Sequence, residues 1–465
     1  MAHADLIVHG GTVATEGGVF DADIVVNDGR IAALTTDSGS WTADERIDAS
    51  RLLVLPGGID VHTHFEEPDP NLLEGFATGG AGAAAGGITT VVEMPQAHPT
   101  TLKPEQFIEK RDLVARNAIV DMALWGGVIG PPAQDRDDLA GLAAAGAAAF
   151  KSFMASSSPF FPAVDHAQLH WAMQEAARLG IPYGLHAEDH AMLAAGLRAM
   201  TEAGRKDPLA HAESRPPIVE TIAVNTALLL AEETGCHVHI CHAASAGALR
   251  LIAAAKARGV NVTAETCPQY LMLNTDDLER RAGFARCAPA LRDQREVDAI
   301  WTFVLDGTID IICSDHCPYT IESKEAGADD IFKAPLGLSG VQTLLPGFYS
   351  EAVVKRGMPV ERFVALTATN PARIFGLCPR KGTLAVGADA DLTLLDPDAA
   401  WTVNVPDILH KQKWTPYEGK SITGRVRRTV RRGVIIFDDA RQGEDRMLAA
   451  PGSGRFLPRG YGEVG

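Results

Sequence analysis

The middle of the chain alternates short apolar runs with longer amphipathic stretches. The apolar runs are rich in Val, Ile and Ala and are bounded by polar residues or Gly, which is typical of buried parallel strands. Residues 104–117, 166–180 and 219–235 separate some of these runs and carry apolar residues at helical spacing. The eight predicted strands cover residues 55–64, 88–94, 119–126, 147–154, 181–187, 236–242, 260–266 and 309–315.

Eight strands that alternate with helices predict an α/β fold of the TIM-like (β/α)8 barrel type, in which chemistry takes place at the carboxyl ends of the strands. A doubly wound open sheet is the alternative. The sequence contains neither G-x-G-x-x-G nor G-x-x-x-x-G-K-[ST], so no phosphate-binding loop supports the open sheet.

Both ends of the chain look different, with short β-branched runs and few helical stretches. Residues 6–55 are punctuated by Gly-Gly and Asp-Gly turns, and strand-like runs return at residues 390–396 and 421–438. We expect the two ends to pair into one small composite β-sandwich. The predicted division is residues 1–54 and 376–440 for the sandwich, 55–375 for the barrel and 441–465 for an extended tail rich in Gly and Pro.

Length and composition agree with a globular protein built from more than one unit. The 465 residues exceed the size of about 250–300 residues at which a single core usually stops growing. There are 42 Lys and Arg against 59 Asp and Glu, so the formal net charge is −17, which argues against a nucleic-acid-binding protein. We find no apolar run that would cross a membrane and no export signal. Seven cysteines without tight pairing motifs favour a reducing cytoplasm.

His62 and His64 lie at the end of the first predicted strand, in the sequence VHTHF. Positions i and i+2 of a strand point to the same face, so both imidazoles could converge on one ion. Imidazole suits zinc and similar divalent metals. Taken alone, an H-x-H sequence is weak evidence, because polar residues at a strand end are common.

Four further candidates close four other predicted strands. Lys151 follows an apolar run, where a lysine either extends to the surface or stays buried as a desolvated amine that has combined with CO₂. In the second case it would be N6-carboxylysine, an anion able to bridge two dications. Six ligand-type residues at five strand ends favour a site for two divalent metal ions at the mouth of the barrel. These residues are His62, His64, Lys151, His186, His242 and Asp315.

Such a site predicts hydrolysis at an electrophilic carbon, with no redox cofactor. Two dications that share a water molecule lower its pKa from 15.7 towards about 7, and they also polarise a carbonyl oxygen. Asp315 is our candidate for the catalytic carboxylate, which takes the proton of the attacking water and delivers it to a leaving nitrogen.

Other histidines and cysteines near these positions fit structural roles. His237 and His239 share the strand of His242 at odd offsets, so we expect them to pack on its other face. Cys241 and Cys313 lie beside proposed ligands, but the sequence has no C-x-x-C, so we interpret them as small core residues.

In combination, these motifs resemble the cyclic amidohydrolases of the amidohydrolase superfamily, which include hydantoinases, dihydropyrimidinases, allantoinases and dihydroorotases. The matching segments extend over nearly the whole chain and are PGGIDVHTH, FKSFM, LHAE, ICHAASA, AETCPQY, CSDHCPY, ATNPARIFGL and KGTLAVGADADL. The resemblance implies a barrel with a composite sandwich, and a homotetramer. It also implies that His62, His64 and Asp315 hold one metal, that carboxylated Lys151 bridges, and that His186 and His242 hold the second metal. Zinc is the expected metal, with manganese, cobalt and iron as alternatives.

Three positions bear on which ring the protein would open. Dihydroorotases of this group carry Arg and Asn where this chain has Glu66 and Gln96, and a glutamate would repel the substrate carboxylate. Dihydropyrimidinases place a Tyr where this chain has Ser156. We therefore expect a hydantoinase or allantoinase that hydrolyses a cyclic amide bond of a hydantoin-like ring, with dihydropyrimidinase or dihydroorotase activity as the alternative. A non-catalytic scaffold on the same fold is disfavoured, because such relatives have lost metal ligands and this chain has all six.

Substrate contacts follow from the resemblance alone. Backbone groups near Ala288 and Gly337 would hold the imide of the ring. Phe153 and Ser156 follow Lys151 and would shape the pocket for the exocyclic substituent, with ordinary loop packing as the competing interpretation. Beyond a small cyclic amide, we expect no nucleic-acid or membrane partner.

Overall fold

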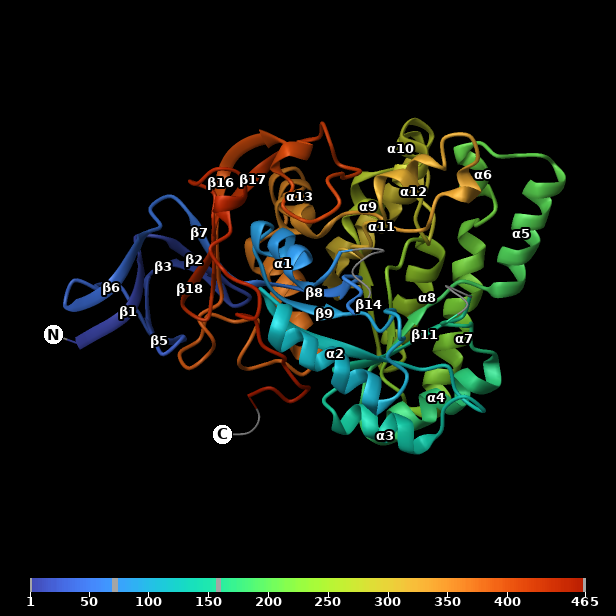
Figure 1. Ribbon diagram of the computed structural model, residues 1–465, viewed down its shortest axis with the longest axis horizontal. Helices are drawn as coiled ribbons and strands as arrows, with labels where there is room; N and C mark the ends of the chain where they lie inside the picture. The colour runs from blue at the N-terminus through green and yellow to red at the C-terminus, as the bar shows by residue number, and fades with distance from the viewer. Residues whose placement is uncertain (1, 69–73, 156–159, 463–465) are drawn as a thin grey trace.

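The computed structural model describes residues 2–68, 74–155 and 160–462, and it divides the chain into a barrel and two smaller sheets (Figure 1). The barrel strands pair in parallel and in chain order, with at least one helix between each strand and the next. All eight predicted strands are present, which confirms the barrel. They are β8 (Gly58–Thr63), β9 (Ile88–Glu93), β10 (Asp121–Gly127), β11 (Ala149–Phe153), β12 (Tyr183–His186), β13 (Val238–Ile240), β14 (Val262–Thr266) and β15 (Ile311–Ile312).

Backbone contacts between the first and last strands close the barrel. Thr63 at the end of β8 forms a parallel bridge with His316, which lies beyond β15. The N–H of His64 donates to the C=O of His316 over 2.8 Å. Between β15 and this contact the chain turns at Asp315, whose φ of 49° lies in the left-handed region. Closure therefore brings His64 and Asp315 to the same edge of the barrel.

Helices surround the strands, and the three predicted helices are confirmed as α2 (Pro104–Asn117), α4 (His166–Leu179) and α7 (Pro217–Thr234) (Figure 1). The ends of α4 follow from local sequence. Asp165 accepts the N–H of Gln168 at the start, and Gly180 ends the helix with a φ of 68°. The remaining α-helices are α1 (Phe76–Ala85), α3 (Arg136–Ala144), α5 (His190–Glu202), α6 (Pro208–Glu213), α8 (Ala246–Ala257), α9 (Pro268–Met272), α10 (Thr275–Arg281), α11 (Gln294–Asp306), α12 (Ile321–Glu325), α13 (Leu344–Tyr349), α14 (Val360–Val364) and α15 (Asn370–Ile374).

The two smaller sheets are built from both ends of the chain, which confirms the composite sandwich. One sheet has the order β5-β4-β1-β6, and the other has the order β18-β17-β16-β7-β2-β3. Aliphatic side chains from both sheets, such as Leu6, Val54 and Leu394, share one buried cluster. The strands are β1 (Ala2–His9), β2 (Thr12–Thr15), β3 (Gly18–Asp21), β4 (Asp23–Asn27), β5 (Arg30–Thr35), β6 (Trp41–Asp48), β7 (Leu53–Pro56), β16 (Leu392–Thr402), β17 (Ser421–Arg431) and β18 (Val434–Asp438).

A buried lysine joins the sandwich to the barrel. The Nζ of Lys381 lies 2.6 Å from the carboxylate of Asp121 on β10 and 2.7 Å from that of Asp391, which precedes β16. Asp389 lies 3.1 Å away. Burial lowers the pKa of Lys381, but the surrounding carboxylates outweigh this effect and hold the pKa above its ordinary value. The ammonium and its partners therefore stabilise one another across the junction.

The described part of the chain after residue 441 contacts the barrel. The N–H of Met122 on β10 donates to the C=O of Arg455, and the N–H of Leu457 donates to the C=O of Met122, both over 2.8 Å. Leu457 is fully buried. The tail that we expected to be extended thus packs along β10 as far as the structure describes it.

None of the described helices has the length and apolar content needed to span a membrane.

Candidate metal centre

The six predicted ligands lie at the carboxyl ends of five barrel strands. They come from β8 (His62), the residue after β8 (His64), β11 (Lys151), β12 (His186), the residues after β13 (His242) and the residues after β15 (Asp315). Five of the side chains are buried, and Asp315 is partly exposed to a cavity.

His62, His64 and Asp315 form the first group. The Oδ1 of Asp315 lies 3.4 Å from the Nε2 of His62 and 3.4 Å from the Nε2 of His64. These distances are too long for strong hydrogen bonds, but they match the spacing of ligands around one cation with bonds of about 2.0–2.2 Å. Burial raises the pKa of Asp315 and the two histidines lower it, with a net pKa below the ordinary value. The three side chains therefore fit a divalent metal.

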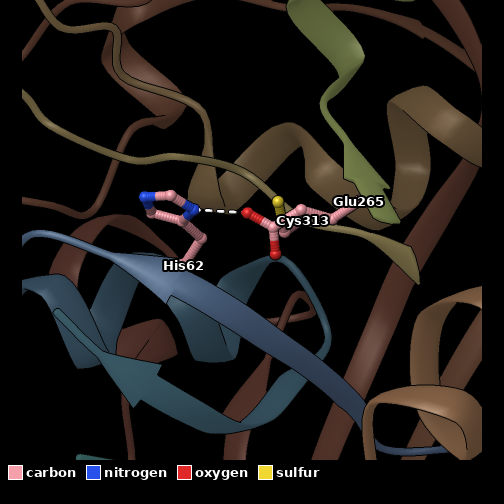
Figure 2. A group of neighbouring side chains, drawn as sticks. All are labelled: His62, Glu265 and Cys313. Carbon is pink, nitrogen blue, oxygen red and sulfur yellow. Dashed lines mark hydrogen bonds and ion pairs between the residues drawn. The ribbon is translucent and has the colours of Figure 1, made fainter. Parts of the chain in front are cut away.

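Glu265 on β14 holds the other side of the His62 ring (Figure 2). Its Oε1 lies 2.5 Å from the Nδ1 of His62, and it also accepts the N–H of His242 over 3.2 Å. A carboxylate on Nδ1 places the ring proton there and leaves the Nε2 lone pair free for a metal. Cys313 lies beside this pair and is buried.

His186 and His242 form the second group. The Nδ1 of His186 lies 3.1 Å from the Nε2 of His242. The other nitrogen of His186, Nε2, lies 2.8 Å from the carboxylate of Glu188, which is itself paired with Arg215 over 2.8 Å. Because Glu188 holds the proton on Nε2, the Nδ1 of His186 carries a lone pair that points at His242. Burial lowers the pKa of both histidines, which favours the neutral, ligating form.

Lys151 lies on β11, and its side chain is fully buried. Within the described part of the chain, its Nζ has no hydrogen-bond partner, and it lies 5.0 Å from the centre of the Phe153 ring. A bare ammonium in such a place is costly. A carbamate that binds metal ions would remove this cost, so Lys151 fits the predicted carboxylated form.

A cavity of about 400 Å³ opens beside these side chains. Its lining includes Phe153 and Ala288, together with Glu66 and Gln96. The lining also includes Arg215, Arg286, Cys317, Tyr319 and residues 332–336.

Two other predicted substrate contacts, Gly337 and Ser156, are not among the residues that line the cavity in the described part of the chain. The N–H of Gly337 donates to the C=O of Arg286 over 3.1 Å, and its C=O accepts from Lys324 over 2.7 Å. Both of its backbone polar groups are thus already paired, so a contact with the ring would require one of them to change partner. Ser156 lies outside the described residues.

His239 lies closer to the centre than we expected. Its Nε2 is 3.1 Å from Glu265, while its Nδ1 and the Nε2 of His237 both contact the hydroxyl of Thr263. The expectation relied on regular alternation as far as His242, but β13 ends at Ile240 and His242 has a φ of 36°, so the alternation does not reach it. Glu265 and Glu188 were missed as site residues, and their only sequence signal is an acidic residue at a strand end.

A second polar cluster, formed by Glu74, His316 and His410, lies next to Asp315 but does not suit a metal. The Oε2 of Glu74 is 3.8 Å from the Nε2 of His316 and 3.8 Å from the Nδ1 of His410. The Nδ1 of His316 accepts the N–H groups of Gly340 and Val341. The proton of neutral His316 is therefore on Nε2, which is a donor towards Glu74 and offers no lone pair.

Comparisons with known proteins agree with this geometry. The Amidohydrolase family matches residues 53–436. The allantoinase of Rubrobacter xylanophilus is 43% identical over 98% of this chain and 98% of its own length, and the L-hydantoinase of Paenarthrobacter aurescens is 36% identical over the same shares. Among solved structures, the L-hydantoinase (dihydropyrimidinase) from Arthrobacter aurescens has a TM-score of 0.94 at 35% identity, and covers 98% of this chain and 100% of that one. A D-hydantoinase has a TM-score of 0.91 at 32% identity, with coverage of 98% and 99%.

Proposed function

The chain belongs to the amidohydrolase family, and from that premise we propose that it hydrolyses a cyclic amide bond of allantoin or of a closely related hydantoin. The observation that carries this proposal is the convergence of imidazole and carboxylate ligand atoms, 3.1–3.4 Å apart, at one end of the barrel. Allantoinase and hydantoinase relatives that match nearly the whole chain support the choice of ring.

In this proposal His62, His64 and Asp315 hold one divalent ion, and His186 and His242 hold the other. Lys151, as N6-carboxylysine, bridges them. Zinc is proposed because neutral imidazole and carboxylate are its usual nitrogen and oxygen ligands, with manganese, cobalt and iron as the alternatives to be measured. When bound, the ions would polarise the ring carbonyl and lower the pKa of a water molecule at the site.

The protein's own side chains orient the ligands and move the proton. Glu265 and Glu188 hold the rings of His62 and His186 so that one nitrogen of each faces the centre. The carboxylate of Asp315 faces the cavity, where it takes the proton of the attacking water and delivers it to the ring nitrogen that leaves. The product is the open-chain carbamoyl compound with a new carboxylate.

The cavity favours a neutral ring with polar substituents. Glu66 lines it and lies 3.4 Å from the Nδ1 of His64, so an anionic substrate such as dihydroorotate would meet a carboxylate next to the centre. Gln96 adds an amide to the same wall. An N-H-rich ureido group, as in allantoin, suits these acceptors. The second candidate is a 5-monosubstituted L-hydantoin, which is favoured by Phe153 in the cavity wall and by the structural likeness to L-hydantoinase.

We also propose that the protein is a homotetramer of the reducing cytoplasm that acts on a small-molecule substrate. All seven cysteines are free thiols, and six of them are buried. Light scattering of the purified protein tests the tetramer directly.

The test of the activity is a hydrolysis panel on metal-replete protein. It comprises allantoin, hydantoin, 5-substituted hydantoins of both hands, dihydrouracil and dihydroorotate. We expect allantoin or a hydantoin to be the best substrate. Dihydroorotate as the best substrate would contradict the argument from Glu66, and a protein that turns over none of the rings would contradict the function.

The test of the centre uses Lys151→Ala beside the surface variant Lys355→Ala. We expect Lys151→Ala to fold, to bind less metal and to lose turnover, while Lys355→Ala behaves like the wild type because its side chain is half-exposed and far from the ligands. Protein prepared with ¹³C-bicarbonate should give a carbamate resonance that Lys151→Ala lacks. A wild-type protein with full metal and no such resonance would contradict the carboxylated lysine.

A further inference from the structure

A second buried lysine, Lys324 of α12, lies behind the wall of the cavity. Its side chain is fully buried, and within the described residues no carboxylate lies within ion-pairing distance of its Nζ. A buried ammonium without a counter-ion is unusual, because burial disfavours the charge unless other groups satisfy it. Other polar groups around Lys324 must therefore stabilise its charge.

Three backbone carbonyl groups surround the ammonium. Its Nζ donates to the C=O of Arg286 over 3.1 Å, of Pro335 over 3.0 Å and of Gly337 over 2.7 Å. The ring of Trp414 lies 5.5 Å away and adds a favourable contact for a cation. Burial lowers the pKa of Lys324 to about 7. A neutral amine has only two N–H donors, so the protonated form alone satisfies all three carbonyls.

The three carbonyls belong to two segments that are far apart in sequence and form one wall of the cavity. Arg286 and Ala288 line the cavity from one segment, and Pro335 and Leu336 line it from the other. The N–H of Gly337 also donates to the C=O of Arg286 over 3.1 Å. Lys324 thus adds a charged clamp at the place where the two segments meet.

The position of Lys324 is itself tightly set. The hydroxyl of Thr320 caps α12 by accepting the N–H of Ser323 over 3.3 Å. Gly283 lies against the helix so closely that a Cβ there would be 1.9 Å from the C=O of Lys324. The backbone that carries the Lys324 side chain is therefore held tightly against Gly283.

We propose that Lys324 is a positioning residue for substrate binding, whose ammonium holds the backbone of Arg286–Ala288 and Pro335–Gly337 at the spacing that the ring substrate requires. This inference rests on the proposed function, because it assigns the cavity wall to the ring. Without the cation, three carbonyl dipoles would point at one another across a buried gap, and the two segments would separate. Lys324 touches none of the proposed metal ligands, so its loss should weaken substrate binding and leave the metal content unchanged.

The test replaces Lys324 by Met, which keeps the length and removes the charge. We expect KM for the best substrate to rise about tenfold while kcat changes by less than about twofold, the signature of lost ground-state binding. Zinc content measured by elemental analysis should equal that of the wild type. Wild-type turnover in the same assay tests the proposed function independently, so a failure of one is distinguished from a failure of the other.

The matched control is Lys256→Met, in which a half-buried lysine that donates to the C=O of Thr308 and to Asp310 is lost from α8. It should lower the thermal midpoint and leave KM unchanged. A Lys324→Met protein with wild-type KM, or with lost zinc, would overturn the positioning role. If Lys324→Met does not fold, Lys324→Gln takes its place, since it is neutral but keeps two donors. A KM raised at least about threefold at unchanged kcat then supports the proposal, and a wild-type KM overturns it.

Discussion

Replacement of Glu265 by Gln tests the idea that carboxylates behind the histidines set the affinity for metal. Glu265 lies 2.5 Å from the Nδ1 of His62, 3.1 Å from the Nε2 of His239 and 3.2 Å from the N–H of His242. Glutamine has nearly the same shape, and its single carbonyl oxygen can still accept the N–H groups of His62 and His242. Its amide NH₂ takes the place of the oxygen that faces the Nε2 of His239. It removes the charge that strengthens the bond to His62.

The expected magnitude follows from this one contact. A hydrogen bond to a charged group contributes about 1.5–3 kcal/mol and a neutral one about 0.5–1.5 kcal/mol, so the substitution loses about 1–2 kcal/mol. That corresponds to a roughly 5- to 30-fold weaker affinity for zinc, which overlaps the lower part of the roughly 10- to 100-fold range known for residues that orient metal-bound histidines. Glu265→Leu removes both acceptor oxygens and all three contacts, and it should weaken zinc binding further, because two imidazole nitrogens and a backbone N–H lose their partner.

The assay measures the zinc dissociation constant by competition with a chromophoric chelator, and turnover at rising zinc concentration. Excess zinc should restore most of the turnover of Glu265→Gln, since the variant loses affinity rather than a reacting group. Glu175→Gln is the matched control, because Glu175 is a buried carboxylate that pairs with Arg136 and Arg178 on the outside of the barrel. A Glu265→Leu protein with wild-type zinc affinity and turnover would refute the reasoning.

Three further outcomes follow. Chelation should abolish turnover and lower the thermal midpoint. Zinc at 100 times its Kd should restore about 2.7 kcal/mol to the free energy of unfolding. An unchanged thermal midpoint on chelation would contradict a metal bound to the folded state. Burial lowers the pKa of His237 to about 4, so between about pH 6.5 and pH 4 the unfolded chain binds a proton that the folded chain does not. The free energy of unfolding therefore falls with falling pH, by about 3 kcal/mol at most. His237→Gln should show a smaller loss of thermal midpoint from pH 7 to pH 5 than the wild type. Lys381→Met removes the nearest counter-ion of the buried Asp121 and Asp391 and should lower the free energy of unfolding by about 3–5 kcal/mol in denaturant titration, whereas Lys355→Met should be nearly neutral.

The barrel could be predicted from sequence because each strand is a local pattern. The boundaries were less accurate where tertiary contacts end a strand. The run at residues 309–315 was predicted as a strand throughout, but only Ile311–Ile312 pairs as one, since the chain turns at Asp315 to meet the end of β8. Such a turn depends on a partner strand that is far away in sequence.

The candidate site shows the same division. The candidate ligands could be selected because each one ends an apolar run, whereas the carboxylates that contact them could not. His62 and Glu265 are 203 positions apart, and which side chains meet across the interior depends on strand register. Backbone contacts are still harder to predict from sequence. The contacts of Gly337 with Arg286 and Lys324, for example, use main-chain groups of Gly337 that every residue type except proline has.

The hydrogen bond between His64 and His316 links the candidate site to the closure of the barrel. His64 directly follows the first barrel strand and Asp315 follows the last, so they meet only once the ring of strands is closed. A nascent chain still on the ribosome, or a fragment cut before residue 315, carries most of the histidines but has no reaction centre. The specific activity of a preparation should therefore be proportional to the fraction of molecules whose barrel is closed.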